Sequence, residues 1–318
     1  MTAASGAEVV APRQAAGRRL RTTTPLQRKN HAGVSAGGHR ARTIISMILL
    51  ILMALYFLVP IWWLLVSSTK STNQLYNTNM FALPSHLNLS YNLHWLSTYE
   101  GSEFWRWFLN SVIYAGATGV LCTLICAMAG YTIAKYKFRG KNLLSMAVLG
   151  ALMVPSAAMT IPVFLMLKDF GMLNSYLSVI LPLLFNPFGV YFMMVYIGEA
   201  MPDELIDAGR IDGASDYSIF FRVGLRIIRP GLVTLFLIVF VSTWNNFFLP
   251  LVMLNKTSLY PVTLGLQIWS TDLSSAGSGE PLYPLIILGA FISILPMLIL
   301  FPILRRYIVS GITLGSVK

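Results

Sequence analysis

The sequence predicts an all-α integral membrane protein with six transmembrane helices. Of its 318 residues, 56% are hydrophobic and only 11% are charged. Soluble domains carry about a quarter charged residues, so this composition is typical of a chain whose solvent is a bilayer. Six windows without Asp, Glu, Lys or Arg are each long enough for a helix to cross about 30 Å of hydrocarbon. These windows are 44–66, 108–134, 143–167, 176–198, 230–253 and 281–304.

The distribution of Lys and Arg predicts the orientation of these spans. With a cytoplasmic N-terminus, the inner segments hold nineteen Lys and Arg residues and the outer loops hold four. Cytoplasmic loops are enriched in these residues, so both termini are predicted to be cytoplasmic in a bacterial plasma membrane. The basic residues are spread over membrane-facing loops without interleaved aromatic residues. The net charge of +11 therefore favours membrane-surface anchoring over nucleic-acid binding.

The first hundred residues divide into a tail, an anchor and a loop. Residues 1–43 are basic and lack hydrophobic periodicity, which predicts a disordered cytoplasmic tail. The apolar run at 44–66 is too long for a secretory signal and has no small-residue cleavage site, so we expect an uncleaved anchor. Residues 67–107 are expected to form an external loop before the second span.

The second, third and fourth spans carry packing and bending signals. Small residues recur every four positions at 111, 115, 119, 123 and 127, which allows another helix to approach closely. This pattern favours packing within the chain, with packing across a dimer as the alternative. Prolines at 155, 162, 182 and 187 interrupt the third and fourth spans, either as hinges or as fixed bends. Cys122 and Cys126 are expected to be small packing residues.

Residues 199–229 predict a structured cytoplasmic loop between the fourth and fifth spans. Pro202 suits a first helical position, and the acidic residues after it complement the helix dipole. Gly213 supplies a left-handed residue to end that helix. Ser215 suits the cap of a second short helix. On that second helix a regular α-helical spacing places Ile219, Phe220 and Val223 on one face, and Arg222, Arg226 and Arg229 in water or among lipid head groups.

At these residues the chain resembles the EAA loop of type I ABC importer permeases, specifically the smaller maltose-permease type of subunit in the sugar-importer branch. Asp207-Ala208-Gly209 stands for Glu-Ala-Ala, Gly213 falls at the family's spacing, and Val223-Gly224-Leu225-Arg226 stands for Ile-x-Leu-Pro. Asp207 carries the charge on a shorter stem. Gly209 still allows close backbone approach but costs about 1 kcal/mol against alanine in a helix. Arg226 replaces a helix-stopping proline, so the second helix is expected to run on towards Arg229, before Pro230.

The resemblance covers about 104–318, including Trp244-Asn245-Asn246 and the C-terminal segment 305–313. It implies a second permease subunit that differs from this one in sequence, two ATP-binding subunits or domains, and an external solute-binding protein. It also implies that an ATPase subunit docks on the 199–229 loop. The residues expected to carry that coupling are Glu204, Leu205, Asp207, Ala208, Gly209, Arg210, Ile211, Asp212, Gly213 and Ala214.

The source of energy is predicted to lie outside this chain. Proton-coupled carriers need ionisable groups at membrane depth, and the six spans contain no Asp, Glu, Lys or Arg. The sequence has no phosphate-binding loop and none of the common hydrolase or metalloprotease motifs, so we expect no cofactor, metal or catalytic residue on it. A secondary carrier or channel remains the alternative class, which an inverted repeat would favour.

Two aromatic and amide patches are candidates for contact with a solute or its carrier. Trp244, Asn245 and Asn246 are a possible translocation pathway, because aromatic faces stack on sugar rings and amides bind hydroxyls. Gln267 and Trp269 lie in the predicted external loop 254–280 and are a possible binding-protein contact. Aromatic residues also gather at membrane interfaces without a ligand. The predicted cargo is a carbohydrate, an oligosaccharide or disaccharide; the alternative is a non-sugar solute such as glycerol phosphate, a peptide or a polyamine.

Overall fold

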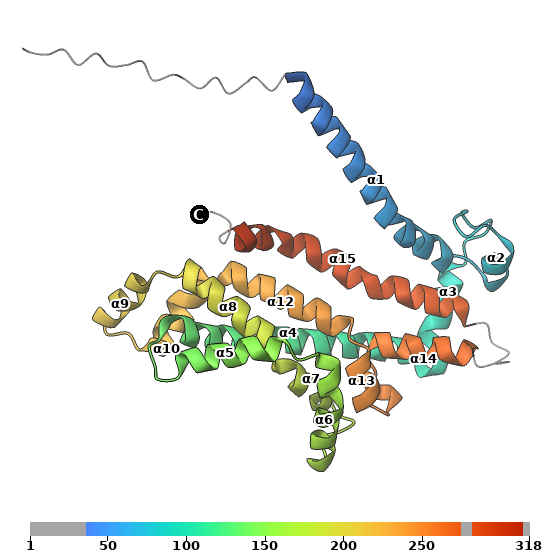
Figure 1. The fold of residues 1–318 in the computed structure, drawn as a ribbon. Coiled ribbons are helices and arrows are strands. Elements are labelled where there is room, and N and C mark those ends of the chain that lie inside the picture. The colour runs from blue at the N-terminus through green and yellow to red at the C-terminus, as the bar shows by residue number, and fades with distance from the viewer. Residues whose placement is uncertain (1–35, 275–281, 314–318) are drawn as a thin grey trace, which may run out of the picture. The chain divides into compact units, whose positions relative to one another are not determined.

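The computed structural model describes residues 36–274 and 282–313, and within them the side chains of 42–273 and 282–304. Contacts divide the chain into two units, residues 1–56 and 57–318. Every regular element among the described residues is helical (Figure 1). The longer elements are α1 (Ala36–Ser68), α2 (Thr72–Asn77), α3 (Leu89–Thr98), α4 (Glu103–Lys135), α5 (Lys141–Leu152), α6 (Ser156–Asp169), α7 (Tyr176–Leu184), α8 (Pro187–Ala200), α9 (Asp203–Ile211), α12 (Arg229–Trp244), α13 (Phe248–Met253), α14 (Val262–Ser274) and α15 (Tyr283–Thr313).

The ends of the chain differ from the predicted boundaries. Helix α1 already begins at Ala36, inside the predicted tail 1–43, and residues 1–35 of that tail lie outside the described residues. Helix α15 continues to Thr313, past the predicted boundary at 304, because its apolar sequence has no helix stop at that point. The basic pair at 305 and 306 therefore lies within a helix, and residues 314–318 are outside the described part.

Three helical segments are long and apolar enough to cross a membrane unaided: Arg42–Ser68, Glu103–Lys135 and Tyr283–Leu304. Three further pairs of helices reach that length only together, and each pair is bent at its junction. The bend is 102° between α5 and α6, and 43° between α7 and α8. The third pair joins residues 216–227 to α12 at 79°. The structure therefore contains three to six candidate spans, compared with the six predicted.

The breaks fall at two of the four prolines. Pro155 directly precedes α6, and Pro187 is the first residue of α8, where the missing N–H of proline is not needed. The side chain of Asn186 caps α8 by accepting a hydrogen bond from Gly189 N at 2.8 Å. Pro162 and Pro182 instead lie inside α6 and α7. Both breaks therefore separate two helices of a predicted span.

The predicted fifth span, 230–253, ends early. Helix α12 stops at Trp244, which gives it a length of about 24 Å from its sixteen residues. A three-residue break separates it from α13, and the Asn246 Oδ1 atom accepts a hydrogen bond from Leu249 N at 3.2 Å. An amide side chain that binds nearby backbone competes with the helical hydrogen bonds, which is the physical reason for the interruption.

Helix α4 is the centre of the second unit. It packs along α8 and α12, and α12 packs in turn against α15 (Figure 1). The five small residues of its predicted face are all buried. A Cβ atom at Gly119 would lie 2.8 Å from the ring of Phe236 in α12, so the two helices meet at contact distance. The small-residue face therefore packs within the chain, as favoured from the sequence.

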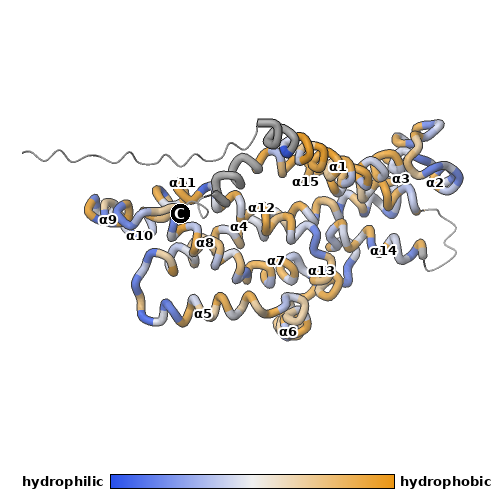
Figure 2. The backbone as a smooth tube through the Cα atoms, turned by 45° about the horizontal axis from the view of Figure 1, so that its top comes forward, coloured by the Kyte–Doolittle hydropathy of each residue, from blue (hydrophilic) through white to orange (hydrophobic). Residues whose placement is uncertain are grey.

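Two apolar clusters lie at the two ends of α4. One surrounds Trp107 and includes residues of α13, α14 and α15, and the other surrounds Tyr131 and includes Ile206, Ile219 and Phe220. The end of α4 at Lys135, next to α9, is called the loop end below. Figure 2 shows hydrophilic colouring around α9 and α10 (Asp216–Ser218) at the loop end, and mostly hydrophobic colouring along α12 and α15. Cys122 and Cys126 are buried and free, as expected of packing residues.

Candidate functional site

Helix α9 carries most of the predicted coupling residues on a solvent-exposed surface. It begins directly after Pro202, one residue later than expected, and its first turn holds Asp203 and Glu204. Only Ile206 is fully buried, with 4% of its surface exposed. Leu205 and Ile211 are apolar yet exposed at 41% and 86%. Exposed apolar side chains on a short, otherwise polar helix are typical of a protein-interaction surface.

The C-terminus of α9 forms the left-handed turn predicted at Gly213. This residue has a φ of +76°, and its N–H donates to Arg210 O at 3.0 Å. The next N–H, of Ala214, donates to Gly209 O at 2.9 Å. These two hydrogen bonds are those of a Schellman motif, which satisfies the last carbonyls of a helix. The turn direction of the loop therefore depends on a residue that tolerates positive φ.

Gly209 brings α9 against the segment that follows the turn. A Cβ atom at this position would lie 2.9 Å from Cγ1 and 3.0 Å from Cδ1 of Ile219. Ile219 itself is buried, with 1% of its surface exposed. The glycine that departs from the family's alanine therefore permits close packing of the two arms of the loop, as expected from the sequence.

Ion pairs hold α9 to the end of α4 and join the two arms of the loop to each other. Lys135 Nζ, at the end of α4, lies 2.8 Å from Asp203 Oδ1, and its own side chain is only 6% exposed. The Lys135 ammonium holds the pKa of the Asp203 carboxyl below its usual range by a hydrogen bond and by charge. Arg210 pairs with Asp216 at 3.1 Å across the turn and with Asp207 at 3.8 Å. The Arg210 guanidinium also lies over the Tyr136 ring, 5.8 Å from its centroid.

The second arm contains a π-helical segment, Ile219–Gly224, which corrects one sequence prediction. Ser215 caps this arm as predicted, accepting a hydrogen bond from Ser218 N at 3.3 Å. Ile219 and Phe220 are buried, but Val223 is 38% exposed and Gly224 is buried instead. The Leu225 N–H donates to Phe220 O, five residues back, so the buried face moves on by one position. The prediction of Val223 on the buried face assumed regular α-helical spacing.

The second arm runs on without a stop at Arg226. Helix α11 (Leu225–Ile227) follows the π-helical segment directly, and α12 begins at Arg229 after a 79° bend. Pro230 lies in the first turn of α12 rather than ending the preceding helix. The second arm therefore ends at Ile227, two residues before Arg229, as expected for a chain with Arg226 in place of the family's proline.

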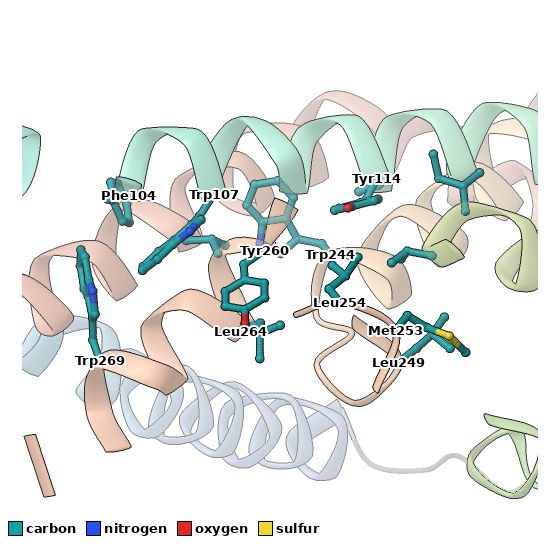
Figure 3. Close-up of a cluster of buried hydrophobic side chains, with 14 of the residues drawn as sticks. Phe104, Trp107, Tyr114, Trp244, Leu249, Met253, Leu254, Tyr260, Leu264 and Trp269 are labelled. Atoms are coloured by element: carbon teal, nitrogen blue, oxygen red, sulfur yellow. The ribbon is translucent and has the colours of Figure 1, made fainter. Parts of the chain in front are cut away.

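The three candidate pathway residues occupy different environments. Trp244 is buried, at 3% exposure, within the apolar cluster drawn in Figure 3. Its ring packs against those of Phe108 and Phe240, with centroids 5.6 and 5.9 Å away. Asn246 holds the break after α12 and accepts a hydrogen bond from Thr263 Oγ1 on its carbonyl. Asn245 is exposed, and its amide also donates to Val241 O at 2.9 Å. Asn245 is therefore the most accessible of the three to a solute.

The two candidate binding-protein contacts also differ in exposure. Gln267 is exposed on α14, whereas Trp269 is 2% exposed. The Trp269 ring packs against Trp107 and Tyr99, with centroids 4.7 and 5.3 Å apart (Figure 3). Helix α14, with 13 residues, occupies about half of the predicted loop 254–280, and residues 275–281 lie outside the described residues.

Side chains of α4 clamp the backbone that leads into α14. Trp107 Nε1 donates to Thr257 O at 2.8 Å, and Tyr114 Oη donates to Leu259 O at 3.0 Å. The Asn110 amide donates to both Ser258 O and Tyr260 O at 3.0 Å, and Tyr176 Oη donates to its Oδ1 atom at 2.7 Å. The segment 257–260 is consequently held as a fixed element. Sequence reasoning missed this clamp, because its partners are about 150 residues apart.

Comparison with known proteins identifies the family. The sequence profile of the binding-protein-dependent transport system inner membrane component matches residues 119–314. The chain belongs to this family. It is 32% identical over 267 residues to an arabinooligosaccharides transport system permease of Bacillus subtilis, covering 84% of this chain and 92% of the relative. A diacetylchitobiose uptake system permease of Streptomyces coelicolor is 28% identical, over 90% of this chain and 93% of its own.

A solved structure confirms the fold of this permease. A bacterial ABC transporter involved in the import of the acidic polysaccharide alginate has a chain that matches with a TM-score of 0.73. The two chains are 24% identical, and the match covers 86% of this chain and 98% of the other. The all-helical, type I ABC importer permease fold predicted from the sequence is therefore confirmed, and the family is one of inner-membrane transport components.

Proposed function

We propose that this chain is a membrane-spanning subunit of a bacterial ABC importer for a carbohydrate, an oligosaccharide or disaccharide. The observation that carries the proposal is the named cargo of its relatives, which match over more than four-fifths of this chain. They include permeases for arabinooligosaccharides, diacetylchitobiose and, in Rhizobium radiobacter at 29% identity, lactose. One relative, 30% identical over 85% of this chain, is named for osmoprotective compounds in a Synechocystis strain, which favours a small compatible solute as the second candidate.

The importer needs partners that this chain does not supply. We propose a second permease subunit, two ATP-binding subunits or domains and an external solute-binding protein. Closure of the ATPase dimer on ATP would move the docked loop, and the spans would then expose the site to the other side of the membrane. A tagged full-length chain purified from its host in mild detergent should bring these subunits with it. Recovery of the chain as a lone polypeptide after crosslinking in the membrane would contradict this composition.

The loop of α9 is the proposed docking element for an ATPase subunit. Its exposed apolar residues Leu205 and Ile211, and the polar surface around them, support this assignment. Leu205→Ser together with Ile211→Ser should release the ATPase subunit without affecting the buried side of α9. Leu87→Ser, at a residue that is 75% exposed in the loop between α2 and α3, is the matched apolar-to-polar control. Full substrate-stimulated ATP hydrolysis in the double variant would show that the docking surface lies elsewhere.

Both termini are proposed to face the cytoplasm. The nineteen inner and four outer Lys and Arg residues support this orientation. Single cysteines at Asp212 and at Gln267, introduced into a variant without Cys122 and Cys126, provide the test. A membrane-impermeant maleimide added to intact spheroplasts should label the cysteine at 267 only. Labelling at 212 without permeabilisation would reverse the orientation.

Asn245 is the proposed solute contact of this subunit, with Trp244 buried behind it and Asn246 holding the helix break. Asn245→Ala removes an amide donor and acceptor from an exposed position, so it should lower uptake without lowering the amount of assembled complex. Trp244→Ala should instead destabilise the fold by about 3–5 kcal/mol, as expected for a buried tryptophan. Wild-type uptake by assembled Asn245→Ala would assign solute recognition to the partner permease.

The cargo itself is best identified through the solute-binding protein. A thermal-shift screen of that protein against disaccharides, short oligosaccharides, glycerol phosphate, peptides, polyamines and compatible solutes would decide between the candidate classes. A carbohydrate should raise its melting temperature in a concentration-dependent way. Stabilisation by a polyamine or peptide alone would contradict the proposed cargo. Gln267 is the proposed contact with this protein, because it is exposed on α14, where Trp269 is not.

A further inference from the structure

Two cavities meet on one face of α4 at the loop end. The first has a volume of about 270 Å³ and lies between the end of α4 and residues 216–221. The second has a volume of about 410 Å³ and lies between α4, α5 and α8. Met128 and Thr132 line both of them, so the two cavities adjoin along the same two turns of α4. Neither cavity is lined by a residue proposed for docking or solute transport, but Arg210 of the docking loop lies next to the first cavity through its ion pair with Asp216.

The first cavity has the chemistry of a site for an organic cation. Five of its lining residues are aromatic, and Asp216 adds a carboxylate. The aromatic residues are Tyr131, Tyr136, Tyr217, Phe220 and Phe221. Aromatic faces attract ammonium groups, and a nearby carboxylate strengthens that attraction. The volume has room for about nine water molecules at roughly 30 Å³ each, which is enough for a small charged head group.

The polar groups in and beside this cavity are suited to a head group that carries one positive and one negative charge. The Tyr131 hydroxyl is buried and has no hydrogen bond of ordinary geometry, although the Tyr136 ring lies beside it at 5.7 Å between centroids. It interacts with the Tyr136 hydroxyl, so a ligand that enters the cavity would share that contact. Asp216 and Arg210, paired at 3.1 Å, present a negative and a positive group side by side. An ammonium fits the first of these, and a phosphate fits the guanidinium.

The second cavity is apolar and lies beside the first on the same turns of α4. Its walls are side chains such as Ile133, Leu144, Val148 and Val190, and Thr132 turns its hydroxyl to Met128 O at 2.9 Å. Met128 and Tyr136 are separated by about 12 Å along the axis of α4. A ligand that fills both cavities thus has a charged end at the edge of the candidate span Glu103–Lys135 and an apolar end inside it.

We infer that these two cavities form a binding site for a phospholipid with a primary ammonium head group, such as phosphatidylethanolamine. The aromatic cavity takes the head group, with its ammonium at Asp216 and the tyrosine rings and its phosphate towards Arg210. The apolar cavity takes the first part of an acyl chain. Because Arg210 and Asp216 also join the two arms of the docking loop, a bound lipid would contact the loop from the membrane side. The inference is independent of the proposed cargo.

Native mass spectrometry of the full-length chain, with any subunits that co-purify, tests the site. Delipidated protein is titrated with phosphatidylethanolamine and with phosphatidylglycerol of the same acyl chains. We expect one phosphatidylethanolamine per copy of the chain, bound at least about tenfold more tightly than phosphatidylglycerol, which lacks the cation. Soluble phosphoethanolamine should bind at least about tenfold more weakly than the lipid, because it has no acyl chain for the second cavity.

Three variants separate this site from lipid that simply surrounds the protein. Thr132→Trp fills the junction of the two cavities from an exposed position and should abolish the selective binding. Leu121→Trp places the same bulk three turns away, at a residue 45% exposed that lines neither cavity, and should leave the binding intact. Tyr217→Leu, at a residue 75% exposed, removes one ring and should reduce the selectivity even if the first variant fails to fold.

Three results would overturn the inference. Equal binding of both lipids would mean that the protein carries only non-specific lipid. Unchanged selectivity in Thr132→Trp or in Tyr217→Leu would place the lipid elsewhere. Binding of phosphoethanolamine as tight as that of the lipid would make the ligand a soluble cation rather than a membrane component.

Discussion

The turn at Gly213 provides a quantitative test of the loop geometry. Its φ of +76° is unfavourable for a residue with a Cβ atom, and no heavy atom lies within 4 Å of the position that this Cβ would take. Gly213→Ala therefore introduces backbone strain without a steric clash, which costs about 1–2 kcal/mol. Gly213→Asn should cost less, because asparagine tolerates the left-handed region.

The matched control is Gly198→Ala in α8. A Cβ atom at Gly198 also has no heavy atom within 4 Å, and its φ is not positive. Alanine in a helix interior is favoured over glycine by about 1 kcal/mol, so this variant should be neutral or stabilising. The effects of the two glycine-to-alanine variants on local stability are therefore predicted to differ by about 2 kcal/mol. The positive φ lowers stability at position 213, and the higher helix propensity of alanine raises it at position 198.

Hydrogen exchange of the peptides that cover 203–214 measures the cost of the two Gly213 variants, and exchange of the α8 peptides measures the effect of Gly198→Ala. A loss of about 1 kcal/mol in the local opening free energy speeds exchange about fivefold. The order of protection should be wild type, then Gly213→Asn, then Gly213→Ala, with Gly198→Ala at least as protected as the wild type. Equal protection of the loop in the wild type and Gly213→Ala would refute the argument that the left-handed turn holds α9 in place.

Three further predictions concern contacts of α4. Lys135→Met should raise hydrogen exchange in 203–211 at neutral pH, where the lowered pKa of Asp203 keeps its carboxylate charged and the ion pair intact. In the wild type this pair should be lost only as the pH falls through that lowered pKa. Asp203→Asn should give the same increase, and additive effects in the double variant would argue against a direct pair. Gly265→Ala would place a Cβ 2.0 Å from the Trp107 ring, so the free energy of unfolding should fall by about 1–3 kcal/mol, seen as a lower melting temperature. The control Gly116→Ala, whose Cβ would have no heavy atom within 4 Å, should not lower the melting temperature. Asn110→Ala leaves two carbonyls and the Tyr176 hydroxyl without a partner, at a cost of about 1–3 kcal/mol, and should make 254–262 sensitive to limited proteolysis; unchanged resistance would contradict the clamp.

The sequence predicted the features that depend on local chemistry. The left-handed turn at Gly213, the cap at Ser215 and the close packing at Gly209 each follow from one residue and its neighbours along the chain. The small-residue face of α4 follows from a spacing of four. These features are recognisable without knowledge of the tertiary structure.

The features that the sequence did not predict depend on distant or cooperative contacts. The π-helical register that buries Gly224 in place of Val223 is not set by hydrophobic spacing alone. Hydropathy counts apolar residues but does not register a break such as that at Asn246, so the fifth window extended to 253. The pairing of Lys135 with Asp203 joins two segments 68 residues apart.

Reconstituted transport is the most direct measurement of the central claim, that this permease imports a carbohydrate with energy from a partner ATPase. The assembled complex in liposomes, given the solute-binding protein and a radiolabelled disaccharide or oligosaccharide identified by the thermal-shift screen, should accumulate the sugar only when ATP is supplied. The chain alone should accumulate none under a proton or sodium gradient. Accumulation by the chain alone under such a gradient, without ATP, would contradict the account and indicate a secondary carrier.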